Sequence, residues 1–564
     1  MKIIIRIFIT LVFFCSQLRA QLSPPIGAKL NYNQVMFSYN EISQASFYKI
    51  ILDEYDSLTA LTPSSSKLIV DSNTCSLVKD LAFGKKYLWR TEAYSQIDQL
   101  ISVSPTYSFS LLKNDFNDPK TYLVQQFINK PEKYNGGIVW LDKYFCALDR
   151  KGNVVWEFPK SFKKPFMPDN MVDLHMYDNG NISFSNDTSV YYFTRDLKLI
   201  WYCHASMLNK IVKVSNFHHV FNRLPNGNFL ALGATTEKFK LDKKDAATFT
   251  YDNSIILEFD SLGKLIWHWE FSKHFDTLLI KDVLKTKGAK NNKLSVMVHC
   301  NSVSYDSTYT HLYLGCRDFN RIIKIDKATK KIIGEYGEKL TPFDTKVYET
   351  NLFSRQHDVK PIGKNEVLLF NNGEESPKGK SYVMRLLLPQ NRKETVKKTW
   401  ELDLDIDSVA PGKAIKYGGA EQLSNGNYLI CGGMNGRILE VTASKEPVWD
   451  LFLKAKTLPV FPFGIFPQYR AYYSSSLYPY YFVISLNKNN SQNIKLYNEG
   501  SDNDSYKIEF FTESSETRSN SVHSIKTQII KSGLSYNIQW PKVVFKSIKV
   551  TSISSGISKW VEVK

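Results

Sequence analysis

Two short hairpin patterns in the middle of the chain decide the fold. One reads RLPNGNFLALG from Arg223 to Gly233, and the other reads NSIILEFDSLGKLIWHWEF from Asn253 to Phe271. Each consists of an apolar run, a turn rich in Asn, Asp and Gly, and a second apolar run. This arrangement predicts two antiparallel strands joined by a tight turn.

Both patterns return along the chain. The first recurs as MYDNGNISFS at Met176, PIGKNEVLLFNNG at Pro361 and QLSNGNYLICGG at Gln422, and the second recurs in residues 137–158, 189–203, 320–337, 381–402 and 436–451. Two hairpins make one four-stranded sheet, and about six copies over residues 115–480 predict a six-bladed β-propeller. An irregular array of β-sandwiches is the alternative, and the constant order of the two hairpins argues against it.

The flanking segments lack this repeat but also alternate as strands do. Strands expected at Val35–Tyr39, Phe47–Leu52 and Lys67–Val70, with LAFGKKYLWRTEAYS around Trp89, predict a fibronectin type III-like β-sandwich over residues 21–114. Residues 485–564, rich in Ser, Ile and Lys, predict a small C-terminal accessory β-domain whose role the sequence does not disclose. The expected architecture is therefore all-β, with the propeller at residues 115–484.

Composition narrows the class of protein. The chain has 564 residues, of which 43% are hydrophobic and 14% aromatic, so it is too long for one core and too apolar to be disordered. Its net charge is +17, yet the basic residues are scattered and no nucleic-acid-binding module is recognisable. We expect no nucleic acid partner, and a basic surface that attracts small anions.

The first residues predict export. Lys2 and Arg6 accompany an apolar run from Ile3 to Phe14, and a short polar segment ends at Ala20. This predicts a signal peptide over residues 1–20, cleaved after Ala20, and an exported protein of the periplasm or medium with no membrane span. Six cysteines follow without a CxxC pair, so they predict neither a zinc ribbon nor a thioredoxin-like redox site.

Three histidines fall in one register of the repeat. His219 precedes Gly227 of PNGN by eight residues, and His357 precedes Asn365 of GKNE by eight residues. His299 begins the corresponding strand of the blade between them. These three histidines are therefore expected at the inner strand ends, where a propeller brings its blades together.

The hairpin after His299 adds a cation to this set. If its turn centres on Thr308, His299 lies opposite Arg317, and Cys300 lies opposite Cys316. Cross-strand partners share a face, so His299 and Arg317 would both point into the channel. The two cysteines would lie behind them, within reach of a disulfide. A shift of one residue in the turn would break this pairing.

Three histidines and an arginine at one channel mouth predict a site for an oxyanion, in which one imidazole can also act as a nucleophile. Zinc is the rival ligand of three histidines, but a guanidinium beside a cation is unfavourable and no HExxH motif is present. A single histidine at the start of a strand more often fills a core. Only the shared register of these three histidines favours a functional role over a structural one. His218 is expected to face the opposite way as a structural residue, although a register slip would exchange it with His219. The other six histidines are expected to be structural: His175, His204, His268, His274, His311 and His523.

At these residues the chain resembles the bacterial aryl-sulfate sulfotransferases. The matching stretches are FHHVFNRLPNGNFLALG from Phe217, DNSIILEFDSLGKLIWHWEF from Asp252, HCNSVSYD, LYLGCRDFNRIIKID, FSRQHDV, LLFNNG and YRAYYSSSLYP from Tyr469. The resemblance implies an exported six-bladed propeller that needs no nucleotide, cofactor or metal. It also implies an aryl sulfate donor, a phenolic acceptor and a ping-pong mechanism through a sulfohistidine.

The resemblance assigns roles residue by residue. His357 of QHD matches the nucleophile, His299 and Arg317 match the pair that grips the sulfuryl group, Asn301 matches its polar neighbour in substrate binding, and His219 matches the first-blade histidine, suited to general acid–base work. Two positions depart from the family pattern: Val220 replaces an acid, and Asn371-Asn372-Gly373 replaces Asp-Asn-Gly.

Other functions stay open from the sequence alone. The alternatives are a non-catalytic secreted propeller that binds an anionic glycan or protein, and a quinone-dependent dehydrogenase, for which no calcium-binding carboxylates can be placed. The natural donor and acceptor are not specified, and a homodimer is compatible with the sequence.

Overall fold

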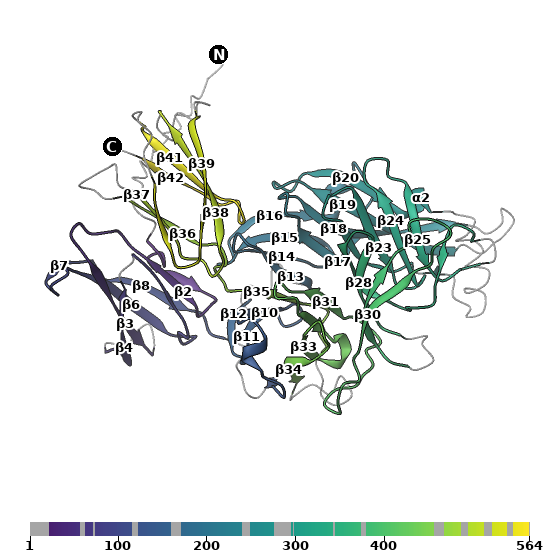
Figure 1. Ribbon diagram of the computed structural model, residues 1–564, viewed down its shortest axis with the longest axis horizontal. Coiled ribbons are helices and arrows are strands. Elements are labelled where there is room, and N and C mark those ends of the chain that lie inside the picture. The colour runs from purple at the N-terminus through teal and green to yellow at the C-terminus, as the bar shows by residue number, and fades with distance from the viewer. Residues whose placement is uncertain are drawn as a thin grey trace, which may run out of the picture. The chain divides into compact units, whose positions relative to one another are not determined.

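In the computed structural model the chain is an all-β protein built from several separate, mainly antiparallel sheets (Figure 1). The structure describes residues 22–56, 62–71, 74–114, 122–159, 171–239, 249–275, 295–296, 298–341, 344–373, 379–455, 467–486, 494–512, 522–538 and 545–562. The predicted signal peptide lies outside them. The helices described are short: η1 (Pro131–Lys133), η2 (Ala205–Leu208), α2 (Phe271–His274) and η5 (Gly433–Asn435). None of these helices has the length and apolar character needed to cross a bilayer.

The chain divides into two compact units. One contains residues 30–33 and 111–479, and the other contains residues 1–29, 34–110 and 480–564. The C-terminal flanking segment and most of the N-terminal one thus fall within the same unit. The division into three domains at residues 114/115 and 484/485 stays a prediction.

The unit that holds the two flanking segments contains four sheets in its described part. The N-terminal segment supplies β1 (Ala28–Leu30), β8 (Tyr107–Leu111), β6 (Lys86–Tyr94), β3 (Phe47–Tyr55) and β4 (Ser65–Asp71) with β7 (Leu100–Val103) on β6, and separately β2 (Val35–Ser38) with β5 (Cys75–Val78). The C-terminal segment supplies β36 (Phe482–Leu486), β37 (Ile494–Asn498) and β40 (Ser535–Ile538), and then β39 (Val522–Ile530), β38 (Asp504–Phe511), β41 (Ser547–Ser552) and β42 (Ser558–Glu562). The three N-terminal strands expected from the sequence are confirmed as β2, β3 and β4.

The unit of residues 111–479 contains six sheets in its described part. The sheets are numbered along the chain, and the strands of each sheet are given in the order in which they pair. Sheet 1 is β35 (Ala471–Ser474), β10 (Ile138–Leu141), β11 (Cys146–Asp149) and β12 (Val154–Glu157); sheet 2 is β13 (Val172–Met176), β14 (Asn181–Ser185), β15 (Ser189–Thr194) and β16 (Leu199–His204); sheet 3 is β17 (Asn216–Arg223), β18 (Phe229–Phe239), β19 (Phe249–Phe259) and β20 (Leu265–Glu270), with β21 (Ser295–Val296) on β19. Sheet 4 is β22 (Cys300–Tyr305), β23 (His311–Cys316), β24 (Arg321–Asp326) and β25 (Ile332–Gly337), with β26 (Tyr348–Glu349) on β25; sheet 5 is β27 (His357–Gly363), β28 (Glu366–Asn371), β29 (Tyr382–Leu387) and β30 (Lys397–Asp403); sheet 6 is β31 (Gly419–Gln422), β32 (Tyr428–Cys431), β33 (Arg437–Val441), β34 (Pro447–Ala455) and β9 (Tyr122–Gln125).

Local sequence explains these hairpins. The PNGN turn closes where the Gly227 N–H donates to the Leu224 carbonyl at 2.9 Å, and Gly227 adopts a φ of 90°, which a residue with a side chain rarely tolerates. Arg223 then pairs with Phe229 across the turn. The predicted hairpins of both patterns are all present, because each needs only contacts between neighbouring parts of the chain.

The first and last strands of this unit each pair with a strand from its other end. β35, which ends the unit in sequence, pairs with β10 in sheet 1, whereas β9, which begins it, pairs with β34 in sheet 6. Each end of the chain segment therefore completes a sheet formed mostly by the other end.

Tryptophans link consecutive sheets. Trp156 of sheet 1 donates its indole N–H to the Arg195 carbonyl of sheet 2, and Trp449 of sheet 6 donates to the Arg150 carbonyl of sheet 1. Trp267 and Trp400 make the same kind of bond, from sheet 3 to sheet 4 and from sheet 5 to sheet 6. Apolar side chains fill the space between successive sheets from sheet 2 to sheet 6. The core is thus divided into layers between sheets.

Candidate active site

The residues singled out by the sequence lie in or next to the first two strands of their sheets. His219 lies in β17, His299 immediately precedes β22, and His357 opens β27. Asn301 is the second residue of β22, and Arg317 directly follows β23. Three successive sheets therefore supply the five predicted site residues.

The backbone is bent at these strand ends. Positive φ angles of 63° at His219 and 55° at Asp358 fall within register shifts of β17 and β27, and the φ of 51° at His299 comes just before the register shift of β22. In β27 the positive φ falls one residue after His357. Such bulges turn side chains out of the regular alternation, and strained conformations of this kind gather at functional sites.

The hairpin of sheet 4 has the predicted pairing at its open end. Cys300 pairs with Cys316, and the Arg317 N–H donates to the His299 carbonyl at 3.0 Å. Nearer the turn the register is shifted by one, because Asn301 is an extra residue between Cys300 and Ser302. The turn is therefore not centred on Thr308, and the bulge restores the predicted pairing. The two Sγ atoms lie 3.0 Å apart as buried free thiols.

Two of the three histidines lie against one tyrosine, and the third lies against one of these two. The rings of His219 and His299 have centroids 5.1 Å apart, and the Tyr469 ring lies 5.4 Å from His219 and 6.3 Å from His357. Tyr469, which lies two residues before β35, is buried, and its hydroxyl donates to the Asn301 carbonyl at 3.1 Å. Within the described residues no group of three or more His, Cys, Asp or Glu side chains is arranged to hold a metal ion.

His357 is a buried neutral imidazole. Its side chain is 2% exposed, and its Nδ1 lies 2.6 Å from Oδ1 of Asn372. Burial lowers the pKa of His357 to about 3. Arg317, His299 and Arg470 lie near enough to oppose its protonation further, and the Asn372 hydrogen bond acts in the other direction. At neutral pH the ring therefore keeps an unprotonated nitrogen, which nucleophilic attack requires.

The neighbouring histidines are also held neutral. Burial lowers the pKa of His219 well below its usual value, and His218 and His299 contribute. Burial lowers the pKa of His218 to about 4. His218 was expected to face away, but its Nδ1 lies 2.7 Å from Nδ1 of His219, so the two rings share one hydrogen bond.

Positive charge surrounds the histidines. Arg317 and Arg355 both donate to the same oxygen, Oδ1 of Asp318, at 2.6 Å and 2.5 Å. Burial lowers the pKa of His299, Asp318 opposes this, and Arg317 and Arg355 lower it further. Two guanidiniums that share one carboxylate leave a local excess of positive charge, which favours an anionic ligand.

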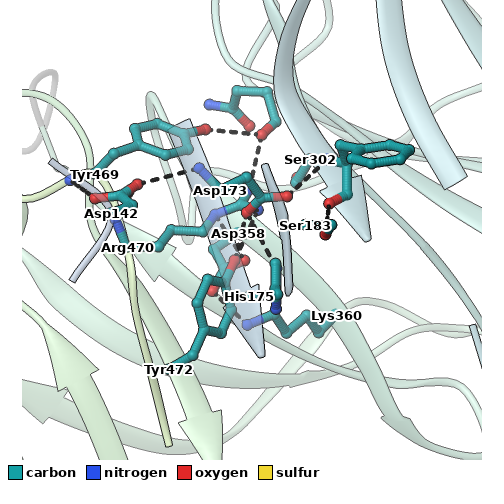
Figure 2. A network of polar contacts seen from close by, with 12 residues as sticks. Asp142, Asp173, His175, Ser183, Ser302, Asp358, Lys360, Tyr469, Arg470 and Tyr472 are labelled. Atoms are coloured by element: carbon teal, nitrogen blue, oxygen red, sulfur yellow. Dashed lines mark hydrogen bonds and ion pairs between the residues drawn. The ribbon is translucent and has the colours of Figure 1, made fainter. Parts of the chain in front are cut away.

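Arg470 is the centre of a buried ionic network (Figure 2). Its Nη1 lies 3.0 Å from Oδ1 of Asp173 in sheet 2, and its Nε lies 3.2 Å from Oδ1 of Asp358 in sheet 5. Its Nη2 donates to the Asn301 carbonyl of sheet 4 at 3.0 Å. One guanidinium thus connects the strand ends of four sheets, including the residue next to His357.

The carboxylates of this network have further partners. Asp173 accepts bonds from the Tyr472 hydroxyl at 2.5 Å and from the Phe221 N–H at 2.7 Å, and Asp358 pairs with Lys360 at 2.7 Å. Burial opposes the charge of Asp358, but Lys360 and Arg470 hold its pKa below the usual range. The network is therefore ionised and internally compensated, unlike the histidine cluster beside it.

Sequence reasoning missed three residues of this site. Asn372 belongs to the Asn-Asn-Gly sequence that departs from the family pattern, and Tyr469 and Arg470 begin the family-like stretch YRAYYSSSLYP. The Asn-Asn-Gly and Tyr-Arg pairs were the available signals. Neither motif shows what its side chains contact, because their partners lie far away in the sequence.

Comparison with known proteins supports the resemblance. Residues 134–446, more than half of the chain, match the family model described as Arylsulfotransferase (ASST). The chain belongs to the arylsulfotransferase family. The matched range includes all five predicted site residues, whereas Tyr469 and Arg470 lie beyond it. Membership in the arylsulfotransferase family indicates sulfotransferase activity in the broad sense.

Other comparisons are more distant. No curated protein matches the chain. Solved structures similar to it include a protein of unknown function from Bacteroides caccae, with 12% identity over 59% of this chain and 93% of its own and a TM-score of 0.36. Another is the β-propeller domain of Cps50 (Swd1) from Myceliophteria thermophila, with 9% identity over 58% of this chain and 88% of its own and a TM-score of 0.31.

Proposed function

We propose that this chain moves the sulfuryl group of an aryl sulfate to a phenol by double displacement, with a sulfohistidine at His357 as the intermediate. The observation that carries this proposal is the buried, neutral His357 beside the positive charge of Arg317, inside the range that matches the arylsulfotransferase model. A neutral imidazole among cations is suited to attack on an anionic ester.

In the first half-reaction, the unprotonated ring nitrogen of His357 forms a bond to sulfur as the bond from sulfur to the aryl oxygen breaks. The aryl oxygen leaves with the bonding pair and takes a proton from His219. Burial keeps this ring neutral in the free protein, and the negative charge of the bound sulfate ester stabilises the imidazolium form that donates the proton. Phenols have a pKa near ~10, so this proton transfer assists departure at neutral pH.

Charge on the three sulfuryl oxygens is balanced by the surrounding groups. Arg317 and His299 would face the oxygens, and Asn301 would help to bind the sulfuryl group. The buried bonds from Tyr469 and Arg470 to the Asn301 carbonyl hold this strand end in place. Hydrogen-bond donors that are already held in place around the sulfuryl group stabilise charge in the transition state without having to reorganise.

In the second half-reaction a phenol replaces the departed one. His219 removes its proton, the oxygen attacks sulfur, and the bond from sulfur to His357 breaks, which restores the neutral imidazole. The aryl rings of both substrates would pack against aromatic side chains such as Tyr469.

We further propose that the six sheets are the six blades of a propeller and that the site lies at its central channel. The strands exchanged between sheets 1 and 6, and the bond from Trp449 to sheet 1, support a closed ring. Export to the periplasm or medium through residues 1–20 belongs to the same proposal.

A two-substrate assay tests the function. With p-nitrophenyl sulfate as donor, phenol as acceptor and no nucleotide, we expect nitrophenolate release that depends on phenol. Double-reciprocal plots at several fixed phenol concentrations should give parallel lines, because the first product leaves before the second substrate binds. Intersecting lines would contradict double displacement, and no turnover across a panel of aryl sulfates would favour a non-catalytic anion-binding protein.

His218 is expected to support the proton transfer by His219. Its Nδ1 lies 2.7 Å from that of His219, so His218→Leu removes the partner that orients this ring, and kcat should fall by about 10- to 100-fold. His218→Asn, whose amide can replace Nδ1, should lose less. The loss should be larger for phenyl sulfate than for p-nitrophenyl sulfate, because the poorer leaving group depends more on protonation. Equal losses for both donors would indicate a purely structural role.

A further inference from the structure

His357 has one buried side-chain partner, Asn372, to which the proposed mechanism gives no role. Asn372 immediately follows β28, the strand paired with β27, and its side chain is fully buried. Its Oδ1 lies 2.6 Å from Nδ1 of His357. The question is which of these two atoms carries the hydrogen.

The other contacts of Asn372 settle the orientation of its amide. Its Nδ2 donates to the Ala414 carbonyl at 2.7 Å and to the Tyr417 carbonyl at 3.0 Å. Both partners are pure acceptors, so the NH₂ group must face them. A flipped amide would place Oδ1 against two carbonyl oxygens and lose both bonds. Oδ1 therefore faces His357.

An amide oxygen can only accept, so Nδ1 of His357 must be the donor. A neutral imidazole carries one hydrogen, and once it is on Nδ1 the lone pair of Nε2 is free. The surroundings keep the ring neutral, because Arg317, His299, Arg470 and His219 face it and no carboxylate is hydrogen-bonded to it among the described residues.

We propose that Asn372 is a positioning residue that holds His357 in its Nδ1–H tautomer and so reserves Nε2 for attack on sulfur. This inference rests on the proposed function of His357. In the balanced step, the Nε2 lone pair forms the bond to sulfur, the aryl oxygen leaves with the bonding pair, and the Nδ1 hydrogen stays. The ring of the sulfohistidine is then formally cationic, and it becomes neutral again when the sulfuryl group departs.

The neutrality of Asn372 matters for the second half-reaction. An aspartate at this position would accept the same hydrogen bond with one oxygen, while its other oxygen would face the Ala414 and Tyr417 carbonyls. When it is ionised, its charge would stabilise the cationic ring of the intermediate. It would also favour protonation of free His357. An amide therefore selects the tautomer without trapping the sulfohistidine, and this difference can be measured.

The experiment compares Asn372→Asp with wild type and with Asn365→Asp, a control in the turn of the same hairpin. Nitrophenolate release without acceptor measures formation of the intermediate, and later addition of phenol measures its discharge. For Asn372→Asp we expect the initial release at neutral pH to persist and the discharge to slow by about tenfold. As the pH is lowered, this variant should lose half of its activity at a pH at least one unit above that of wild type, because the carboxylate raises the pKa of His357. Asn365→Asp should match wild type in both respects.

A second measurement needs no variant. The ¹⁵N chemical shifts of the His357 ring in the free wild-type protein should show a protonated Nδ1 and an unprotonated Nε2 at neutral pH. An unprotonated Nδ1 would overturn the proposal. So would an Asn372→Asp enzyme whose new carboxyl group is ionised, as its ¹³C chemical shift would show, but whose discharge rate and pH profile equal those of wild type. Failure of the proposed function would look different, since wild type itself would then form no sulfohistidine at His357.

Discussion

Changing His357 to alanine is expected to reduce sulfuryl transfer by roughly 10⁴-fold or more, because it removes the group that forms the covalent intermediate. The measurement is nitrophenolate release from p-nitrophenyl sulfate with phenol present. A companion measurement is the mass of the intact protein after donor is added without acceptor. Wild type should gain one sulfuryl group, and His357→Ala should gain none.

The matched control is His268→Ala, which removes a half-buried histidine from the fourth strand of sheet 3, outside the candidate site. It should retain activity within about twofold of wild type, since surface changes away from a site are usually small in effect. Turnover in His357→Ala within tenfold of wild type would remove His357 as the nucleophile. A sulfuryl group found on another residue would do the same.

Changing Arg470 to methionine is expected to lower the free energy of unfolding by about 4 kcal/mol, because removal of one partner of a buried ion pair leaves the other charge uncompensated. Asp173 is fully buried and Asp358 is 2% exposed, and the guanidinium bonds both. Urea-induced unfolding measures this loss. Lys264→Met, at an exposed position in the turn between β19 and β20, should change the free energy of unfolding by about 0.5 kcal/mol or less.

A double variant separates lost charge compensation from lost packing. If the uncompensated carboxylate is the cause, adding Asp173→Asn to Arg470→Met should recover about 1 kcal/mol or more, because the amide can remain buried without a charge. The amide oxygen can still accept the N–H of Phe221. If the double variant recovers none of the free energy of unfolding, the network stabilises the fold through packing and not through charge compensation.

The hairpins were predictable because their determinants are local. The PNGN turn places a glycine at the positive φ of Gly227, and the apolar runs on either side then pair as β17 and β18. The facing of His299 and Arg317 followed from the same local counting. The counted register is wrong by one residue between Asn301 and the turn, because the bulge at Asn301 adds a residue that no turn rule predicts.

The contacts within the candidate site depended on tertiary structure. His219, His299 and His357 could be placed at equivalent strand ends, but the ring of Tyr469 between them comes from a segment more than 100 residues later in the chain. His218 was expected to be structural because strict alternation would point it away from His219. The bulge in β17 cancels that alternation and lets the two rings share a hydrogen bond.

By itself, the sequence determined that the chain is all-β, that its middle is built from repeated hairpins, and that it belongs among the arylsulfotransferases. Those conclusions depend on spacing and on short-range pairing, which the order of residues contains directly. Only the tertiary structure decided that Arg470 bonds residues of three other sheets and that Asn372 orients His357. Both depend on buried hydrogen bonds between distant segments, whose geometry exists only once the sheets have packed together.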